Sequence, residues 1–214
     1  EGPGQNEIDF RYSDPLTAAD NVMTFQSIVK FIAQRSGLYA DFSPKPLAGA
    51  PGSGFHINMS VQGRDGGDHL PEMVAGVLDK VGDMTAFLNP TEDSYLRFGG
   101  HKAPKYISWS AENRSQLVRI PAAAGEYRRA ELRSPDPMAN PYLAFALMIR
   151  AGLHGMEDGL SLPQPANLNL YQADAETLMG FECLPQSLAA ARTAAANSPF
   201  IRSVLPKELI EGYR

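Results

Sequence analysis

The chain has 214 residues, of which 43% are hydrophobic and 20% are charged, and its formal net charge is −5. This length suits one large domain or two small ones, and the negative charge excludes a general nucleic-acid coat. The single Cys183 excludes an internal disulfide framework and a cysteine metal cluster, so a reducing compartment is the default. No apolar run reaches roughly 18 residues, and we expect no contact with a membrane.

The first third of the chain alternates between strand and helix patterns. Polar and apolar side chains alternate over 4–12, which is typical of a half-buried strand. Asp14 and Pro15 mark a helix start, and apolar residues then recur at helical spacing up to Gly37. We further expect a strand over 38–42, a Pro- and Gly-rich loop over 44–52, and a strand over 54–62 with Gly54, His56, Asn58 and Ser60 on one face.

The remaining pattern is a helix, a loop, three strands and more helices. We expect an amphipathic helix over 70–81, a mobile loop over 91–105, strands near 105–110, 115–120 and 126–133, a long helix over 140–154, and short helices over 163–214. Residues 163–214 carry no motif to which we assign chemistry. Strands at hairpin spacing followed by helices favour an α+β fold with an antiparallel sheet.

Arginine is concentrated in one part of this acidic chain. Six of its 13 arginines fall within 37 residues, and they are Arg97, Arg114, Arg119, Arg128, Arg129 and Arg133. The planar guanidinium group matches the oxygens of carboxylates and phosphates, so the cluster indicates an anionic ligand with several groups. Exposed arginines paired with surface acids are the alternative.

The strand predicted over 126–133 places charged side chains on one face. Period two aligns Tyr127, Arg129, Glu131 and Arg133. This row is either a cross-strand ladder of ion pairs or a site where a carboxylate binds a cation and guanidinium groups bind phosphate. Mg²⁺ and Mn²⁺ prefer oxygen ligands, and Glu131 and Glu7 are candidates.

His56 follows a Gly-Ser-Gly sequence. A lone histidine on a strand is more often structural than a ligand, but glycines beside it let the backbone approach a ligand closely. The residues alone therefore indicate an anion- and metal-binding α+β domain.

Several segments, in order and at close to the expected spacing, resemble the catalytic domain of glutamine synthetases of the soluble bacterial type. They are residues 4–7 (GQNE), 52–56 (GSGFH), 89–91 (NPT), 94–97 (SYLR), 113–115 (NRS), 119–121 (RIP), 131–137 (ELRSPDP) and 139–143 (ANPYL). The resemblance is dense over residues 1–156 and weak over the helical part, 157–214.

The resemblance implies a curved antiparallel sheet with packed helices. It also implies a partial catalytic domain over 1–214, without the N-terminal β-grasp domain, from a cytoplasmic, ring-type homo-oligomer. The implied reaction joins ammonia to the γ-carboxylate of glutamate through γ-glutamyl phosphate, with ATP and two Mg²⁺ or Mn²⁺ ions. Cations and arginines would offset the charge on the transferring phosphoryl group.

Site residues follow from the motifs that match. Glu7 resembles a ligand of the cation nearer glutamate, and His56 and Glu131 resemble ligands of the cation at the ATP phosphates. The resemblance assigns glutamate binding to Gly52, Arg97 and Arg133, catalysis to Arg97, Arg114 and Arg133, and ATP contacts to Ser60, Arg114, Arg119 and Arg129.

Three departures bear on these expectations. The sequence does not include the family's upstream Glu-x-Glu strand, which supplies a carboxylate to each cation, so we expect the chain alone to be inactive. The family's other metal-binding glutamate corresponds to Glu1 or to the residue before it. Lys102 stands where the family has a loop glutamate that helps to deprotonate ammonium, and a lysine repels NH₄⁺. Pro51 and Asn58 replace an asparagine and a histidine near the substrate.

These departures leave alternatives open. Either another loop acid replaces the missing glutamate, or the acceptor is a polyamine or another amine. A catalytically silent structural or regulatory relative is a further possibility, although the matched metal and arginine residues are retained. A pure nucleotide-binding module is disfavoured, because no Gly-x-Gly-x-x-Gly or P-loop pattern is present.

The tail gives one further hint. Residues 167–171 faintly resemble a loop whose tyrosine is adenylylated in some members, but Gln172 and Ala173 replace the Leu-Pro that follows it. We therefore expect no modification of Tyr171.

Overall fold

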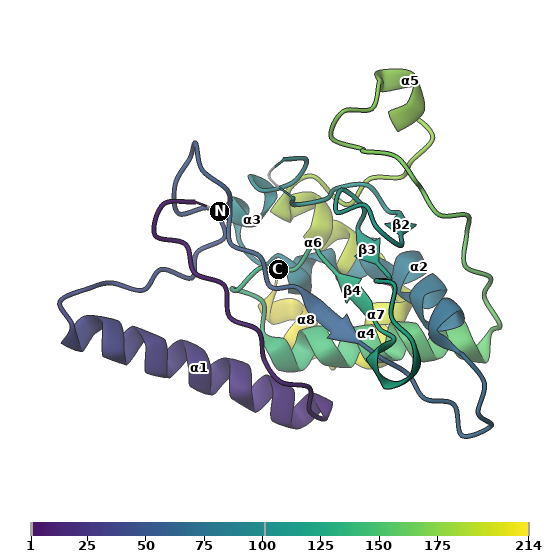
Figure 1. The fold of residues 1–214 in the computed structure, drawn as a ribbon, viewed down its shortest axis with the longest axis horizontal. Coiled ribbons are helices and arrows are strands. Elements are labelled where there is room, and N and C mark those ends of the chain that lie inside the picture. Colours follow the sequence, from purple (N-terminus) through teal and green to yellow (C-terminus); the bar gives the residue numbers. More distant parts are fainter. Residues whose placement is uncertain (1, 101, 214) are drawn as a thin grey trace.

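A computed structural model describes residues 2–100 and 102–213 (Figure 1). The helices are α1 (Pro15–Arg35), α2 (Leu70–Leu88), α3 (Glu92–Tyr95), α4 (Pro141–Glu157), α5 (Ala175–Leu178), α6 (Leu188–Asn197), α7 (Pro199–Val204) and α8 (Lys207–Gly212), with a 3₁₀ turn, η1 (Gly125–Tyr127). The strands are β1 (Ile57–Met59), β2 (Trp109–Ser110), β3 (Val118–Arg119) and β4 (Ala130–Leu132).

The four described strands form one sheet in the order β1-β4-β3-β2. β4 pairs antiparallel with both β1 and β3, whereas β2 pairs parallel with β3. The loop between β2 and β3 is shorter than most parallel crossovers, and this pairing spans only two residues on each strand. The α+β class is confirmed, and the sheet is mixed rather than wholly antiparallel.

Two helix starts follow from the expected capping residues. Asp14 accepts a hydrogen bond from the Thr17 backbone N–H at 3.0 Å, and Pro15 is the first residue of α1. Asn140 accepts from the backbone N–H groups of Tyr142 and Leu143 at the start of α4. The prediction for α2 ended too early, because burial of Met84, Phe87 and Leu88 extends the helix past Gly82.

Two predicted strands, 4–12 and 38–42, are wrong. Both segments lie outside any strand, and Figure 1 shows the first, in purple, running alongside α1. Phe10 and Phe42 each pack edge-on against Phe25 of α1, with ring centroids 5.3 and 6.2 Å away. Their apolar side chains therefore pack on a helix instead of on a sheet.

The hydrophobic core lies between the sheet and the helices. Ile57, Val118 and Leu132 come from β1, β3 and β4, and they pack in one cluster with α2, α4 and the C-terminal helices. The segment before β2 is also joined to the C-terminal part, because Tyr106 bridges to Cys183. No described helix is both long and apolar enough to span a bilayer.

Helices α2 and α4 contact each other backbone to backbone. A Cβ atom on Gly155 would collide with the Glu72 carbonyl oxygen and lie 2.6 Å from the Gly76 nitrogen. We expect Gly155→Ala to lower the free energy of unfolding by about 1–3 kcal/mol through overpacking, measured by chemical denaturation of the full-length protein.

Gly82→Ala is the matched control, because nothing lies within 4 Å of a Cβ atom at that position of α2. The same helix-favouring change is expected there to raise stability by up to about 1 kcal/mol. Equal effects at the two positions would show that the helices are not in close contact.

Candidate functional site

The sheet has one apolar face and one charged face. Strand register pairs Glu131 of β4 with Asn58 of β1 on one side and with Arg119 of β3 on the other. Cross-strand partners project to the same face, so these three polar side chains are neighbours. The neighbouring positions, Ile57 and Leu132, pack into the core on the opposite face.

Glu131 is the centre of an ionic cluster. Its Oε2 atom accepts a hydrogen bond from Arg119 Nε at 2.7 Å and lies 3.0 Å from Arg133 Nη1. Its Oε1 atom lies 3.3 Å from His56 Nδ1. Burial raises the pKa of Glu131, but His56, Arg133 and Arg119 together lower it well below its usual value, so the carboxylate is ionised. The structure therefore brings together His56 and Glu131, the two residues expected to bind the cation at the ATP phosphates, and places Arg133 beside them.

Arg97 lies against the Gly-Ser-Gly loop. A Cβ atom on Gly52 would lie 2.6 Å from Arg97 Cγ and from the Pro44 carbonyl oxygen, and one on Gly54 would lie 3.3 Å from Arg97 Nη2 and 3.1 Å from His56 Nε2. Glycine is required here because the loop backbone approaches these side chains closely. The structure thus places Gly52, Arg97 and His56 side by side.

We expect Gly52→Ala to disturb Arg97 without unfolding the protein. The added methyl group must displace the Arg97 side chain or the loop. If the site takes the substrates that the resemblance implies, the KM for glutamate should rise about tenfold while the KM for ATP stays within twofold. Steady-state kinetics on the full-length protein measures both values. Gly49→Ala, in the same loop but with nothing within 4 Å of its Cβ position, should leave both unchanged.

Arg97 is part of a buried network of hydrogen bonds and an ion pair. Arg97 Nη1 donates to the Ser134 carbonyl oxygen at 3.0 Å and lies 3.8 Å from Asp136 Oδ2. Asn89 Nδ2 donates to Asp136 Oδ2 at 2.9 Å. Asp136 is fully buried, and burial raises its pKa against the opposing effects of Arg97 and Asn89. Asp136 and Asn89 therefore position Arg97.

Two of the predicted ATP contacts, Ser60 and Arg129, lie beside β1, at one edge of the sheet. Arg129 Nε donates to Asn58 Oδ1 at 3.2 Å. Ser60 and Asn58 line a cavity of about 320 Å³ between β1, α4 and the N-terminal segment, whose lining is otherwise mainly apolar and includes Tyr12 and Phe145. A polar rim over an apolar hollow of this size suits a planar ring with polar substituents.

Glu7 and Arg114 are not brought into the cluster. Both are exposed, although the N-terminal segment is attached nearby through Gln5 Nε2, which donates to the Gly52 carbonyl oxygen at 3.0 Å. Over residues 2–100 and 102–213, no three His, Cys, Asp or Glu side chains gather as a metal site. Glu1, the other candidate metal ligand, lies outside the described residues. The loop expected over 91–105 contains α3, and its mobility stays a prediction.

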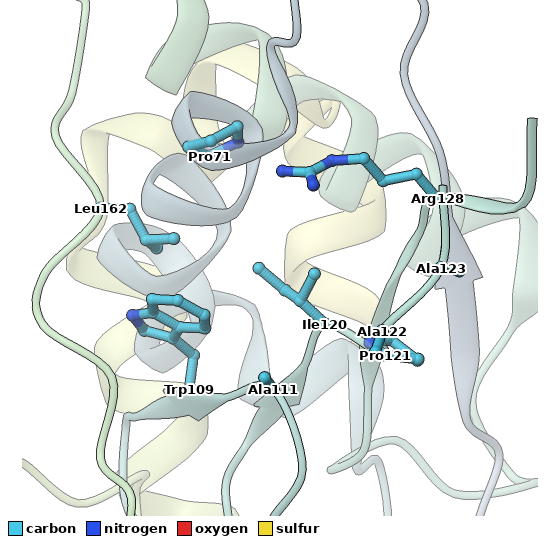
Figure 2. Close-up of a pocket in the computed structure, with 9 residues that line it drawn as sticks. All are labelled: Pro71, Trp109, Ala111, Ile120, Pro121, Ala122, Ala123, Arg128 and Leu162. Carbon is cyan, nitrogen blue, oxygen red and sulfur yellow. The ribbon is translucent and has the colours of Figure 1, made fainter. Parts of the chain in front are cut away.

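A second cavity, of about 300 Å³, has a mainly apolar lining (Figure 2). Figure 2 shows Trp109, Ile120 and Leu162 lining it, with the Arg128 side chain reaching towards Pro71. Arg128 Nη2 pairs with Asp68 Oδ2 at 2.7 Å. Its single cationic lining residue is thus already paired, and this cavity does not fit the polyanionic ligand that the arginine cluster indicates.

Sequence reasoning did not assign roles to Asp136, Asn89 or Tyr171. Asp136 and Asn89 lie inside motifs that were recognised, but their burial was not foreseeable from spacing. Tyr171 lies in the part without an assigned motif, and its hydroxyl is buried near the arginines.

Comparisons with known proteins agree with this arrangement. The family model described as "Glutamine synthetase, catalytic domain" matches residues 1–214. The chain is 43% identical over 218 residues to a glutamine synthetase of Staphylococcus epidermidis (strain ATCC 35984) and 44% identical over 227 residues to one of Methanosarcina mazei. These alignments cover 95% and 99% of this chain but 49% and 51% of the relatives, so the chain spans about half their length.

A solved structure described as "GmaS/ADP complex-Conformation 1" has the same fold. It matches with a TM-score of 0.84 and 30% sequence identity, over 95% of this chain and 50% of that one.

Proposed function

Because the chain belongs to the glutamine synthetase catalytic-domain family, we propose that it forms the catalytic part of an ATP-dependent ligase that joins ammonia to the γ-carboxylate of glutamate. The reaction would proceed through γ-glutamyl phosphate. A carboxylate is a poor electrophile, and transfer of the ATP γ-phosphoryl group to it creates a leaving group that an amine can displace.

The ionic cluster at Glu131 carries this proposal. The buried Glu131 carboxylate contacts the guanidinium groups of Arg119 and Arg133 through Oε2, and its Oε1 faces His56. Arg119 and Arg133 are thereby fixed at the site, and guanidinium groups fixed in place stabilise charge on a transferring phosphoryl group without reorganising.

The acidic substrate would bind beside the Gly-Ser-Gly loop. Arg97 and Arg133 are both almost fully buried, and their planar guanidinium groups suit carboxylates. The Gly52 backbone lies against Arg97 and is the proposed contact for the rest of the substrate. This arrangement would orient the γ-carboxylate towards the phosphoryl group.

The residues present fit part of a Mg²⁺ or Mn²⁺ site. His56 and Glu131 Oε1 are a nitrogen and an oxygen donor in contact, and both cations accept such donors together with phosphate oxygens. A bound cation would offset phosphate charge. We propose His56 and Glu131 for the cation at ATP and Glu7 for the one nearer glutamate, with further carboxylates from outside this chain.

On the ATP side, Ser60 and Arg129 are the proposed nucleotide contacts, and the apolar cavity beside Ser60 would take the base. Arg114 and Arg119 would bind the phosphates and the transferred group. We also propose that residues 1–214 are a partial catalytic domain, completed within a ring-shaped homo-oligomer by an N-terminal domain.

An assay of the full-length protein tests this function. We expect phosphate release from ATP to require glutamate, an amine and Mg²⁺ or Mn²⁺ together, with a γ-glutamyl product identified by mass spectrometry. A catalytically silent relative would release no phosphate under any of these conditions, and that result would overturn the proposal.

A different amine acceptor is the second candidate. Lys102 is exposed and replaces the expected loop glutamate by a cation, which disfavours NH₄⁺. Comparing kcat/KM for ammonium with those for a panel of alkylamines and polyamines would decide between them. A higher value for ammonium would support glutamine formation, and a higher value for an amine would support the second candidate.

A further inference from the structure

Tyr171 lies in the segment between α4 and α5, to which no chemistry is assigned. The segment is fixed to the sheet, because Leu170 N donates to Ser115 Oγ at 2.9 Å and Gln116 Nε2 donates to the Leu168 carbonyl oxygen at 2.8 Å. Ser115 and Gln116 are themselves buried just before β3. The backbone just before Tyr171 is thus held in a defined position.

The Tyr171 hydroxyl is buried and has no hydrogen-bond partner among the described residues. Arg97 Nε and Arg133 Nε are also buried without a partner there. Arg133 N donates to the Leu117 carbonyl oxygen at 3.0 Å, and Arg97 Nη1 donates to the Ser134 carbonyl oxygen at 3.0 Å, so both arginines lie next to the segment that holds Leu170. Their charges act on Tyr171. Buried polar groups are normally paired, so a group of donors that lacks acceptors fits an oxygen-rich anion.

The hydroxyl is neutral in this environment. Burial raises the pKa of Tyr171 to about 12, although the charges of Arg133 and Arg97 act in the opposite direction. A neutral hydroxyl can donate a hydrogen bond to an anion without the cost of burying a third positive charge.

We propose that the Tyr171 hydroxyl donates a hydrogen bond to an oxygen of the acidic substrate bound by Arg97 and Arg133, an inference that rests on the proposed function. The C-terminal segment would then contribute a binding residue to the site, beside the sheet and the Gly-Ser-Gly loop.

Tyr171→Phe in the full-length protein tests this role, because it removes only the hydroxyl. We expect the KM for glutamate, and its Kd by calorimetry, to rise about tenfold or more, while the KM for ATP stays within twofold. The thermal midpoint should stay the same or rise, because the lost hydroxyl had no partner in the protein. Tyr213→Phe, at a half-buried tyrosine that packs on Phe87, should change none of these values.

The outcomes separate this inference from the proposed function. An active Tyr171→Phe protein with an unchanged KM and Kd for glutamate would overturn the inference alone. A lower thermal midpoint with equal rises in both KM values would show a structural role and would also overturn it. If the wild-type protein neither binds glutamate nor uses it, the proposed function is wrong, and the inference is wrong with it.

Discussion

Glu131→Gln is expected to lower kcat/KM by about 10²–10³-fold in the full-length protein. The substitution keeps the shape of the side chain but removes the charge that fixes Arg119 and Arg133 and that faces His56. The concentration of Mn²⁺ that gives half-maximal rate should also rise, because an amide is a weaker ligand than a carboxylate. Kinetics with Mn²⁺ titration, well below the unfolding temperature, measures both effects.

Glu112→Gln is the control, because Glu112 is exposed and lies in the loop after β2. It should retain wild-type kinetics. A Glu131→Gln protein that is folded and has wild-type kcat/KM and Mn²⁺ dependence would show that the cluster is only a structural ion-pair ladder, the alternative reading of the Arg-Glu-Arg row.

Asp136→Ala is expected to reduce the free energy of unfolding by about 3–5 kcal/mol, since it leaves the buried Arg97 without its charge partner. Asn89 also loses the acceptor that it reaches at 2.9 Å. A buried donor left unpaired adds its own desolvation cost. Chemical denaturation of the full-length protein, followed by circular dichroism, measures the change.

The matched control is Asp158→Ala. Asp158 is exposed and pairs with the partly buried His154 at 3.3 Å, and pairs at the surface contribute about 0–1 kcal/mol. If the two substitutions cost the same, Asp136 does not hold Arg97 by charge, and the buried network described above is not what positions that arginine.

The starts of α1 and α4 and the face of the strand around Glu131 were predictable from the sequence, because they depend on residues close together in the chain. Asp14 and Asn140 are polar caps directly before a proline, and both begin helices where expected. The alternation around Glu131 placed it with Arg133 on one face, and the ion pair between them confirms this.

The predictions that failed depended on partners far away in the chain. Alternation over 4–12 is compatible with a strand, but pairing needs a neighbouring strand, and Phe10 packs on Phe25 of α1 instead. A strand-like sequence alone does not determine which element its apolar side chains contact.

Parts of the site needed the fold as well. Periodicity could place His56 on a face of the strand predicted over 54–62. Only the pairing of β1 with β4 brings His56, which directly precedes β1, to Glu131. Asp136 and Tyr171 were not assigned because their importance comes from burial beside arginines distant in sequence.

The most direct test is a crystal structure of the full-length protein with Mn²⁺ and ADP, with the metal located by anomalous scattering. We expect a Mn²⁺ ion coordinated by His56 and by Glu131 Oε1, with ADP phosphates on the same ion and Arg119 beside them. The account would be contradicted if Mn²⁺ and ADP bound elsewhere and the His56–Glu131 contact stayed intact, away from the nucleotide. The cluster would then not be the catalytic centre.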